Sequence, residues 1–90
     1  MGYWQALMEA GLNSDIQVQG KSYHVQTEDW GWENPFIVTK IFSQGAVLKS
    51  YKIPYQEVFR SPFASRESIR TALEKQHHEI LDRLVSGHID

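Results

Sequence analysis

The chain has 90 residues, of which 41% are hydrophobic and 22% charged, and its formal net charge is −2. This composition excludes a disordered chain, and the length leaves no room for a second folded unit, so we expect residues 1–90 to form a single domain. The chain has no cysteine, which excludes a disulfide framework, a thiolate nucleophile and a thiolate metal site.

The charges are distributed unevenly along the chain. Residues 1–36 carry five acidic side chains against one lysine, whereas residues 37–70 carry six basic side chains against two acidic ones. The net negative charge argues against strong nonspecific attraction to a phosphate backbone. The middle of the chain is nevertheless locally basic.

The N-terminal residues show no targeting signal. They lack a basic region followed by a long apolar run, so we expect no membrane insertion and, with cysteine absent, a cytoplasmic protein. Residues 1–12 predict a short docking helix with Trp4, Leu7 and Met8 on one side and Gly11 at its end. Two turns are too few to be stable alone, so this segment is expected to dock on the domain, on a second copy or on a partner.

Residues 15–27 predict a β-hairpin that follows a turn at residues 13–15. The Gly20-Lys21 pair suits a type II′ turn, and the alternation of apolar and polar residues is typical of a sheet with one face in water. This register places Val18 opposite Tyr23 and Ile16 opposite Val25.

Residues 28–35 interrupt the strand pattern with acids, Gly, Asn and Pro, which predicts a loop. Trp30 and Trp32 lie in this loop, two positions apart. Both can close the core; alternatively one caps the core while the other sits at the rim as a binding residue, since indole is favoured at interfaces.

Residues 36–53 predict a second β-hairpin around Gln44-Gly45. Ile37, Ile41 and Leu48 are expected on its core face. The other face is expected to pair Phe42 with Val47, Lys40 with Lys49, and Val38 with Tyr51.

Two lysines directly opposite each other are unfavourable unless an anion or an acid lies near. We therefore regard Lys40, Phe42, Lys49 and Tyr51 as a candidate binding surface. The alternative is that both lysines lie along a half-covered sheet with their stems on the rings.

A connection at residues 55–63 leads to the long C-terminal helix predicted at residues 65–86. Ser65 is the expected N-cap, Gly87 ends the helix, and Gln76 interrupts the apolar stripe with His77 at its flank. The apolar stripe comprises Ile69, Ala72, Leu73, Ile80, Leu81, Leu84 and Val85. The predicted fold is α+β: a four-stranded antiparallel sheet of two hairpins, packed by this helix, with the short N-terminal helix added.

One stretch resembles a known family. Tyr23-His-Val-Gln-Thr-Glu-Asp29, then Asn34-Pro35, Ile37, Thr39, Ile41-Phe42 and Gly45, and later residues 74–77, are similar to a small uncharacterised bacterial domain family. The resemblance covers about residues 15–87. It implies a bacterial origin and these domain limits, and it brings no activity or catalytic residue with it.

Few residues in the chain suit catalysis. No nucleophile-elbow pattern frames a serine, and His24 beside the acids at positions 28 and 29 is typical of a surface histidine. Glu74, His78 and Asp82 are spaced four residues apart on one helical face, but a single helix does not complete a metal site. We therefore expect no enzyme, no metal and no cofactor.

The sequence favours a noncatalytic binding or adaptor domain that contacts another protein or itself. The candidate residues are the surface defined above together with Trp30 and Trp32, and Trp4, Leu7 and Met8 are candidates for partner docking. The alternative is a nucleotide or single-stranded nucleic acid bound on the lysine and aromatic face.

Overall fold

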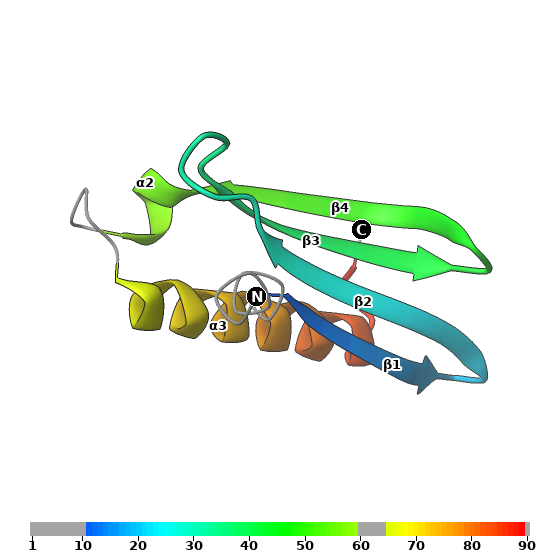
Figure 1. Ribbon diagram of the computed structural model, residues 1–90. Coiled ribbons are helices and arrows are strands. Elements are labelled where there is room, and N and C mark those ends of the chain that lie inside the picture. The colour runs from blue at the N-terminus through cyan, green and yellow to red at the C-terminus, as the bar shows by residue number, and fades with distance from the viewer. Residues whose placement is uncertain (1–10, 60–64, 90) are drawn as a thin grey trace, which may run out of the picture.

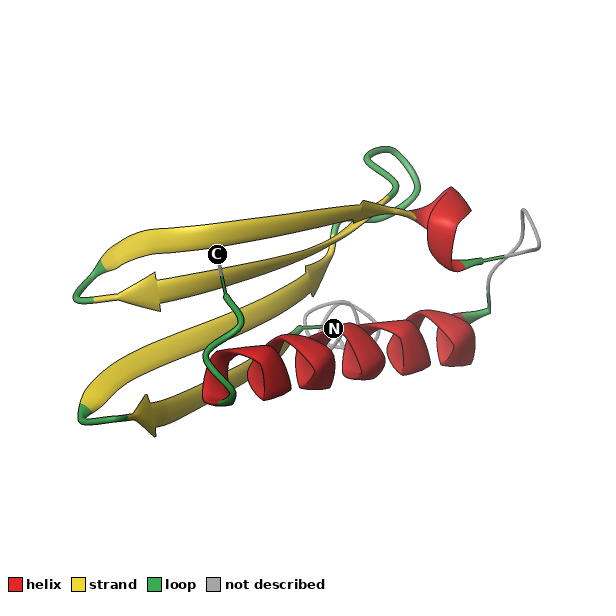
Figure 2. Ribbon diagram, turned by 180° about the vertical axis from the view of Figure 1, so that it is seen from behind, coloured by secondary structure: helices red, strands yellow, loops and turns green. Residues whose placement is uncertain are grey.

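The computed structural model describes residues 11–59 and 65–89. Its strands β1 (Leu12–Val18), β2 (Lys21–Asp29), β3 (Phe36–Ser43) and β4 (Ala46–Pro54) form one antiparallel sheet in the order β1-β2-β3-β4. Two helices follow, the short α2 (Tyr55–Val58) at the end of β4 and the long α3 (Arg66–Val85). Helix α3 lies along one side of the sheet, where it packs on β1, β2 and β3 (Figures 1 and 2).

The predicted α+β architecture, with a four-stranded antiparallel sheet and a long C-terminal helix, is confirmed. The predicted connection after β4 contains α2. The predicted N-terminal helix with Trp4, Leu7 and Met8 falls outside the described residues. Leu12, at the end of that predicted segment, is the first residue of β1.

The first turn lies one residue before its predicted position, at Gln19-Gly20 instead of Gly20-Lys21, and this shifts the strand register by two residues. Gln19 and Gly20 both have positive φ, 53° and 83°, which is the type I′ conformation that joins two strands tightly. Ile16 therefore pairs with Tyr23 instead of Val25, and residues 13–15 belong to β1 instead of a turn. Because the register shift is two residues, each side chain keeps its predicted face.

A β-bulge in β4 overturns part of the predicted register of the second hairpin. Phe42 pairs with Val47 as predicted, but Ile41 pairs with Lys49, so Leu48 is an extra residue in β4. Beyond a bulge, the strand presents the opposite set of side chains to each face. Leu48, predicted in the core, is accordingly 56% exposed.

Helix α3 has the predicted boundaries because both its ends are capped. The Ser65 hydroxyl accepts a hydrogen bond from the Ser68 backbone N–H at 3.0 Å. At the other end Gly87 adopts φ +78°, and the backbone N–H groups of Gly87 and His88 donate to the carbonyls of Leu84 and Arg83. This pair of bonds is the Schellman motif, which the left-handed glycine permits.

The core between α3 and the sheet consists of two apolar clusters. The first contains Val25, Ile41, Ile80 and Leu84, and the second contains Ile37, Tyr55, Ala72 and Leu73. Between them lies a row of buried polar residues, Thr27 and Thr39 on the sheet and His77 on α3.

Two tyrosines near this core differ in how their hydroxyls are satisfied. The Tyr55 hydroxyl donates to Asp29 Oδ1, and burial, followed by the Asp29 carboxylate, raises the pKa of this phenol far above its ordinary value. Asp29 also accepts from the Gly31 N–H at 3.1 Å, so it connects α2 to the loop after β2. The Tyr51 hydroxyl is buried and has no hydrogen-bond partner in residues 11–59 and 65–89.

We predict that the same substitution has opposite consequences at these two positions. Tyr55→Phe removes the phenol donor of Asp29, which then keeps the Gly31 N–H, and should lower the free energy of unfolding by about 1–2 kcal/mol. Tyr51→Phe removes an unsatisfied buried hydroxyl and should leave that free energy unchanged or raise it by up to about 1 kcal/mol. Urea denaturation of the two variants beside the wild type measures both effects, and a larger loss at Tyr51 would contradict the assignment.

Candidate functional site

Among residues 11–59 and 65–89, both helices lie away from one face of the sheet, and we call it the free face (Figure 1). Antiparallel pairing alternates the side chains of each strand between α3 and this face. The free face carries Asn13, Asp15 and Gln17 from β1, Ser22, His24, Gln26 and Glu28 from β2, Phe36, Val38, Lys40 and Phe42 from β3, and Val47, Ser50 and Lys52 from β4.

The four-residue surface predicted from the sequence is divided between the two faces. Lys40 pairs with Ser50 instead of Lys49, and Val38 pairs with Lys52 instead of Tyr51. The physical reason is the bulge at Leu48, which reverses the alternation of β4. Lys40 and Phe42 therefore lie on the free face, whereas Lys49 and Tyr51 lie on the side of α3.

An apolar strip runs along β3 on the free face. Three of the four outward side chains of this strand are Phe36, Val38 and Phe42. Val38 is only 2% exposed although α3 lies on the other side of the sheet, and its neighbours across the ladder are Glu28 and Lys52. Sequence reasoning placed Val38 on this face but missed Phe36 and Lys52; Lys52 was predicted on the opposite face because the bulge was not visible in the sequence.

Trp30 and Lys52 extend this strip at the loop end of the sheet. The Lys52 ammonium lies 4.4 Å from the Phe36 ring centroid and 5.1 Å from that of Trp30. These are cation–π distances, and the aliphatic stem of a lysine can cover apolar surface. Glu28 accepts hydrogen bonds from Gln26 Nε2 at 2.6 Å and from Trp30 Nε1 at 3.4 Å, so its carboxylate is held in place.

Trp32 lies in a different environment from Trp30. Its ring meets Tyr55 edge-on with centroids 4.8 Å apart, and Tyr55 meets Phe59 in the same way at 5.2 Å. Trp32 thus caps the second core cluster, while its other side is open and the residue is 53% exposed. Of the two predicted candidates, Trp30 belongs to the free face and Trp32 to the end of the core.

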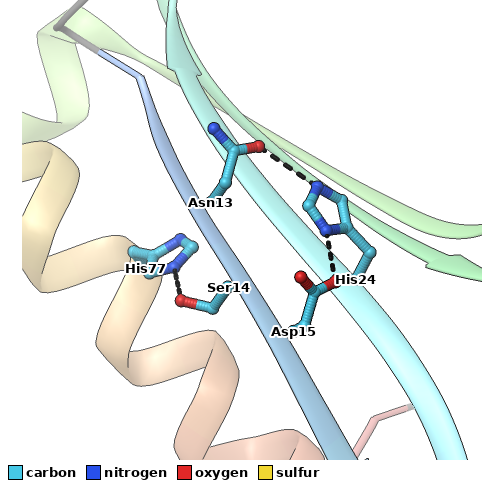
Figure 3. A network of polar contacts seen from close by, with 5 residues as sticks. All are labelled: Asn13, Ser14, Asp15, His24 and His77. Carbon is cyan, nitrogen blue, oxygen red and sulfur yellow. Dashed lines mark hydrogen bonds and ion pairs between the residues drawn. The ribbon is translucent and has the colours of Figure 1, made fainter.

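His24 occupies the opposite end of the free face. Its Nδ1 lies 2.8 Å from Asp15 Oδ1 and its Nε2 lies 3.1 Å from Asn13 Oδ1, so both ring nitrogens are engaged by β1 (Figure 3). The ring also lies 5.9 Å from that of Phe42. A shallow hollow of about 750 Å³ is lined by Asp15, His24 and Phe42 together with the Gln44-Gly45 turn.

His77 lies on the other side of β1 from His24 (Figure 3). Its Nε2 is 2.8 Å from Ser14 Oγ and its Nδ1 is 2.8 Å from Thr27 Oγ1. Thr27 in turn contacts Thr39 at 2.7 Å, and Gln76 Nε2 donates to Thr39 at 2.9 Å. The polar residues that interrupt the predicted helix stripe, Gln76 and His77, were the sequence signal for this buried contact.

The hydrogen-bond directions in this row assign the His77 tautomer. Because Thr39 accepts from Gln76, its own hydrogen is free to donate to Thr27, and Thr27 then donates to Nδ1 of His77. Nε2 therefore carries the proton and donates to Ser14. With the directions reversed, the Thr39 hydrogen has no acceptor among the described residues.

A second concave surface lies between β4 and α3. It is a groove of about 660 Å³ that contains Tyr51 and Ile53 from the sheet. The Arg83 guanidinium and the Lys49 ammonium lie 5.6 Å and 6.0 Å from the Tyr51 ring centroid. Lys49 and Tyr51, which were predicted for the other face, therefore meet on the helix side of the sheet, and Tyr51 lines the groove. The rim mixes acids and bases, namely Glu57, Lys75, Glu79, Asp82 and Arg83.

The described residues contain no group of three or more His, Asp or Glu side chains placed to hold a metal ion. Glu74, His78 and Asp82 are exposed, and Glu74 pairs with Arg70 at 3.7 Å. No helix in residues 11–59 or 65–89 is both long and apolar enough to cross a membrane.

Comparison of the chain with protein-family models, with curated proteins and with solved structures gave no match.

The His77 row generates a prediction about pH. Burial, and then the neighbouring His78 and His24, lower the pKa of His77 in the folded protein, whereas a histidine in the unfolded chain titrates near 6.5. Below about pH 6.5 the unfolded chain binds a proton that the folded protein does not. The stabilisation from neutral His77 is thus fully present above this pH and is lost as the pH falls towards the lowered folded pKa.

A matched variant isolates this contribution from that of the carboxylates. The free energy of unfolding of wild type and of His77→Gln should be measured by urea denaturation from pH 8 down to about pH 5. We expect the wild type to be more stable at pH 8 and its advantage to shrink by about 1 kcal/mol on acidification. A constant difference across this range would show that His77 does not resist protonation.

Proposed function

We propose that this domain is a noncatalytic adaptor that docks another protein, or a second copy of itself, on its free face. The observation that supports this most strongly is the strip of Phe36, Val38 and Phe42 on the side without α3. The solvated face of an antiparallel sheet normally carries polar residues, and β1 and β2 follow that rule here. Val38 is buried, but Phe36 and Phe42 on either side of it are half-buried, and accessible apolar rings in the middle of such a face are typical of an interaction surface.

The free face is held rigidly at both ends, which favours binding. At the loop end the Trp30 backbone N–H donates to the Phe36 carbonyl at 3.0 Å, and the Tyr55 N–H donates to Pro35 at 2.8 Å. At the hairpin end His24 is fixed by Asn13 and Asp15. Side chains that are already ordered lose little conformational entropy when a partner binds.

The same geometry disfavours phosphate recognition and catalysis as roles for this face. The paired lysines on which the nucleotide hypothesis depended lie on different faces, and Lys52 already contacts two rings. His24, the histidine that the described residues place on this face, has both ring nitrogens engaged, so neither is poised to accept a proton from a substrate. Mixed charges around an apolar strip suit a protein surface better.

In-cell photo-crosslinking tests this proposal. A benzophenone amino acid at Phe42 should give covalent adducts with protein in the cells that make this chain, because Phe42 lies in the strip. The matched control is the same amino acid at Val85, which is 62% exposed but lies on α3. Mass spectrometry of the adducts identifies the bound protein, and adducts at Val85 but none at Phe42 would contradict the proposal.

A further inference from the structure

We infer that the free face pairs with the free face of a second copy of this chain, an inference that rests on the proposed function. The face is electrically polarised across its width. Its acidic side chains are Asp15 on β1 and Glu28 on β2, and its lysines are Lys40 on β3 and Lys52 on β4. A surface that is acidic on one half and basic on the other can complement itself.

Only one orientation of a face-to-face two-fold axis uses this polarity. An axis parallel to the strands, between β2 and β3, places β1 over β4 and β2 over β3 of the second copy, so Glu28 faces the lysines of β3 and β4, while Asp15 faces Val47. An axis perpendicular to the strands places each strand over itself, so acids face acids and lysines face lysines. The parallel axis is also compatible with the small strand angle of aligned sheet packing.

The observed register then specifies the contacts. Because Glu28 and Val38 are paired within the sheet, Glu28 lies over Val38 of the second copy. There it is flanked by Lys52, the cross-strand neighbour of Val38, and by Lys40, two residues along β3. Each copy contributes one such acid and one such pair of lysines.

The same axis brings aromatic side chains together. Phe42 is paired with His24 within the sheet, so it faces His24 of the second copy. The Trp30 N–H bonds to the Phe36 carbonyl, so Phe36 faces Trp30 of the second copy. Ring contacts therefore lie at both ends of the interface, with the opposite charges between them.

The free face is large enough for a specific but reversible contact. The strands have seven to nine residues, and four of them spaced ~4.8 Å apart cover roughly 19 Å by 26 Å, or about 500 Å² per copy. Two copies then bury about 1,000 Å², the lower limit of specific interfaces. We therefore expect a dimer that dissociates on dilution.

Charge reversal tests the inference because opposite reversals should restore each other only between copies. Glu28→Lys places a lysine against two lysines of the second copy, and Lys40→Glu places a glutamate against a glutamate. Each variant alone should weaken the dimer by at least about tenfold. An equimolar mixture should form a heterodimer, since the reversed residues then face each other and the unchanged ones retain their partners.

Analytical ultracentrifugation over a wide dilution series measures the dimer fraction of the wild type, of Glu28→Lys, of Lys40→Glu and of the equimolar mixture of these two variants. Glu79→Lys, a reversal at an exposed position of α3, is the control and should dimerise like the wild type. Thermal melts verify that every variant folds, because Glu28 also accepts hydrogen bonds within its own sheet.

Two results would overturn the inference: a wild type that stays monomeric, or single variants that dimerise as the wild type does. Neither result bears on the broader adaptor role, which the Phe42 adducts decide. Adducts of Phe42 with a different protein, found together with a monomeric wild type, would retain the proposed function and remove the dimer. A dimeric wild type without Phe42 adducts to any other protein would leave the second copy as the sole partner.

Discussion

The buried hydrogen-bonded row from Gln76 to Ser14 determines where α3 sits on the sheet. The apolar clusters on either side of this row are held by hydrophobic contacts, which have no preferred direction. Hydrogen bonds between His77, Thr27 and Thr39 tolerate only one helix position, because a displaced helix would leave buried donors and acceptors unpaired. This position places α3 over β1, β2 and β3 and leaves a groove beside β4.

The bulge at Leu48 has a comparable influence on the surface. It moves Lys49 and Tyr51 to the helix side and brings Ser50 and Lys52 to the free face. Lys52 can then lie across Phe36 and Trp30, which it could not reach from the other face. The extra residue Leu48 therefore determines which β4 side chains line the groove beside α3 and which lie on the free face.

The fold followed largely from local sequence signals, whereas the site followed only in part. Alternation in β1 to β3 and the spacing in α3 depend on neighbouring residues, so the faces and the helix boundaries were predictable. A Gln-Gly pair forms both turns, but an adjacent Gly-Lys pair offered an equally plausible turn in the first hairpin. A bulge depends on how two strands fit each other, and no residue near Leu48 marks it; the predicted Lys40 and Lys49 surface failed for that reason.

The order of the strands connects the charge pattern of the sequence to the charge pattern of the surface. In a meander, strands adjacent in the sequence are adjacent in space, so position along the chain becomes position across the sheet. The acidic first third of the chain contributes β1 and β2, and the basic middle contributes β3 and β4. A charge difference along the sequence thereby becomes a charge difference across the sheet. The apolar strip of β3 lies next to the line between the acidic and basic halves of the sheet. Such a face attracts a surface of the reverse polarity, and a copy turned about the strand direction presents one.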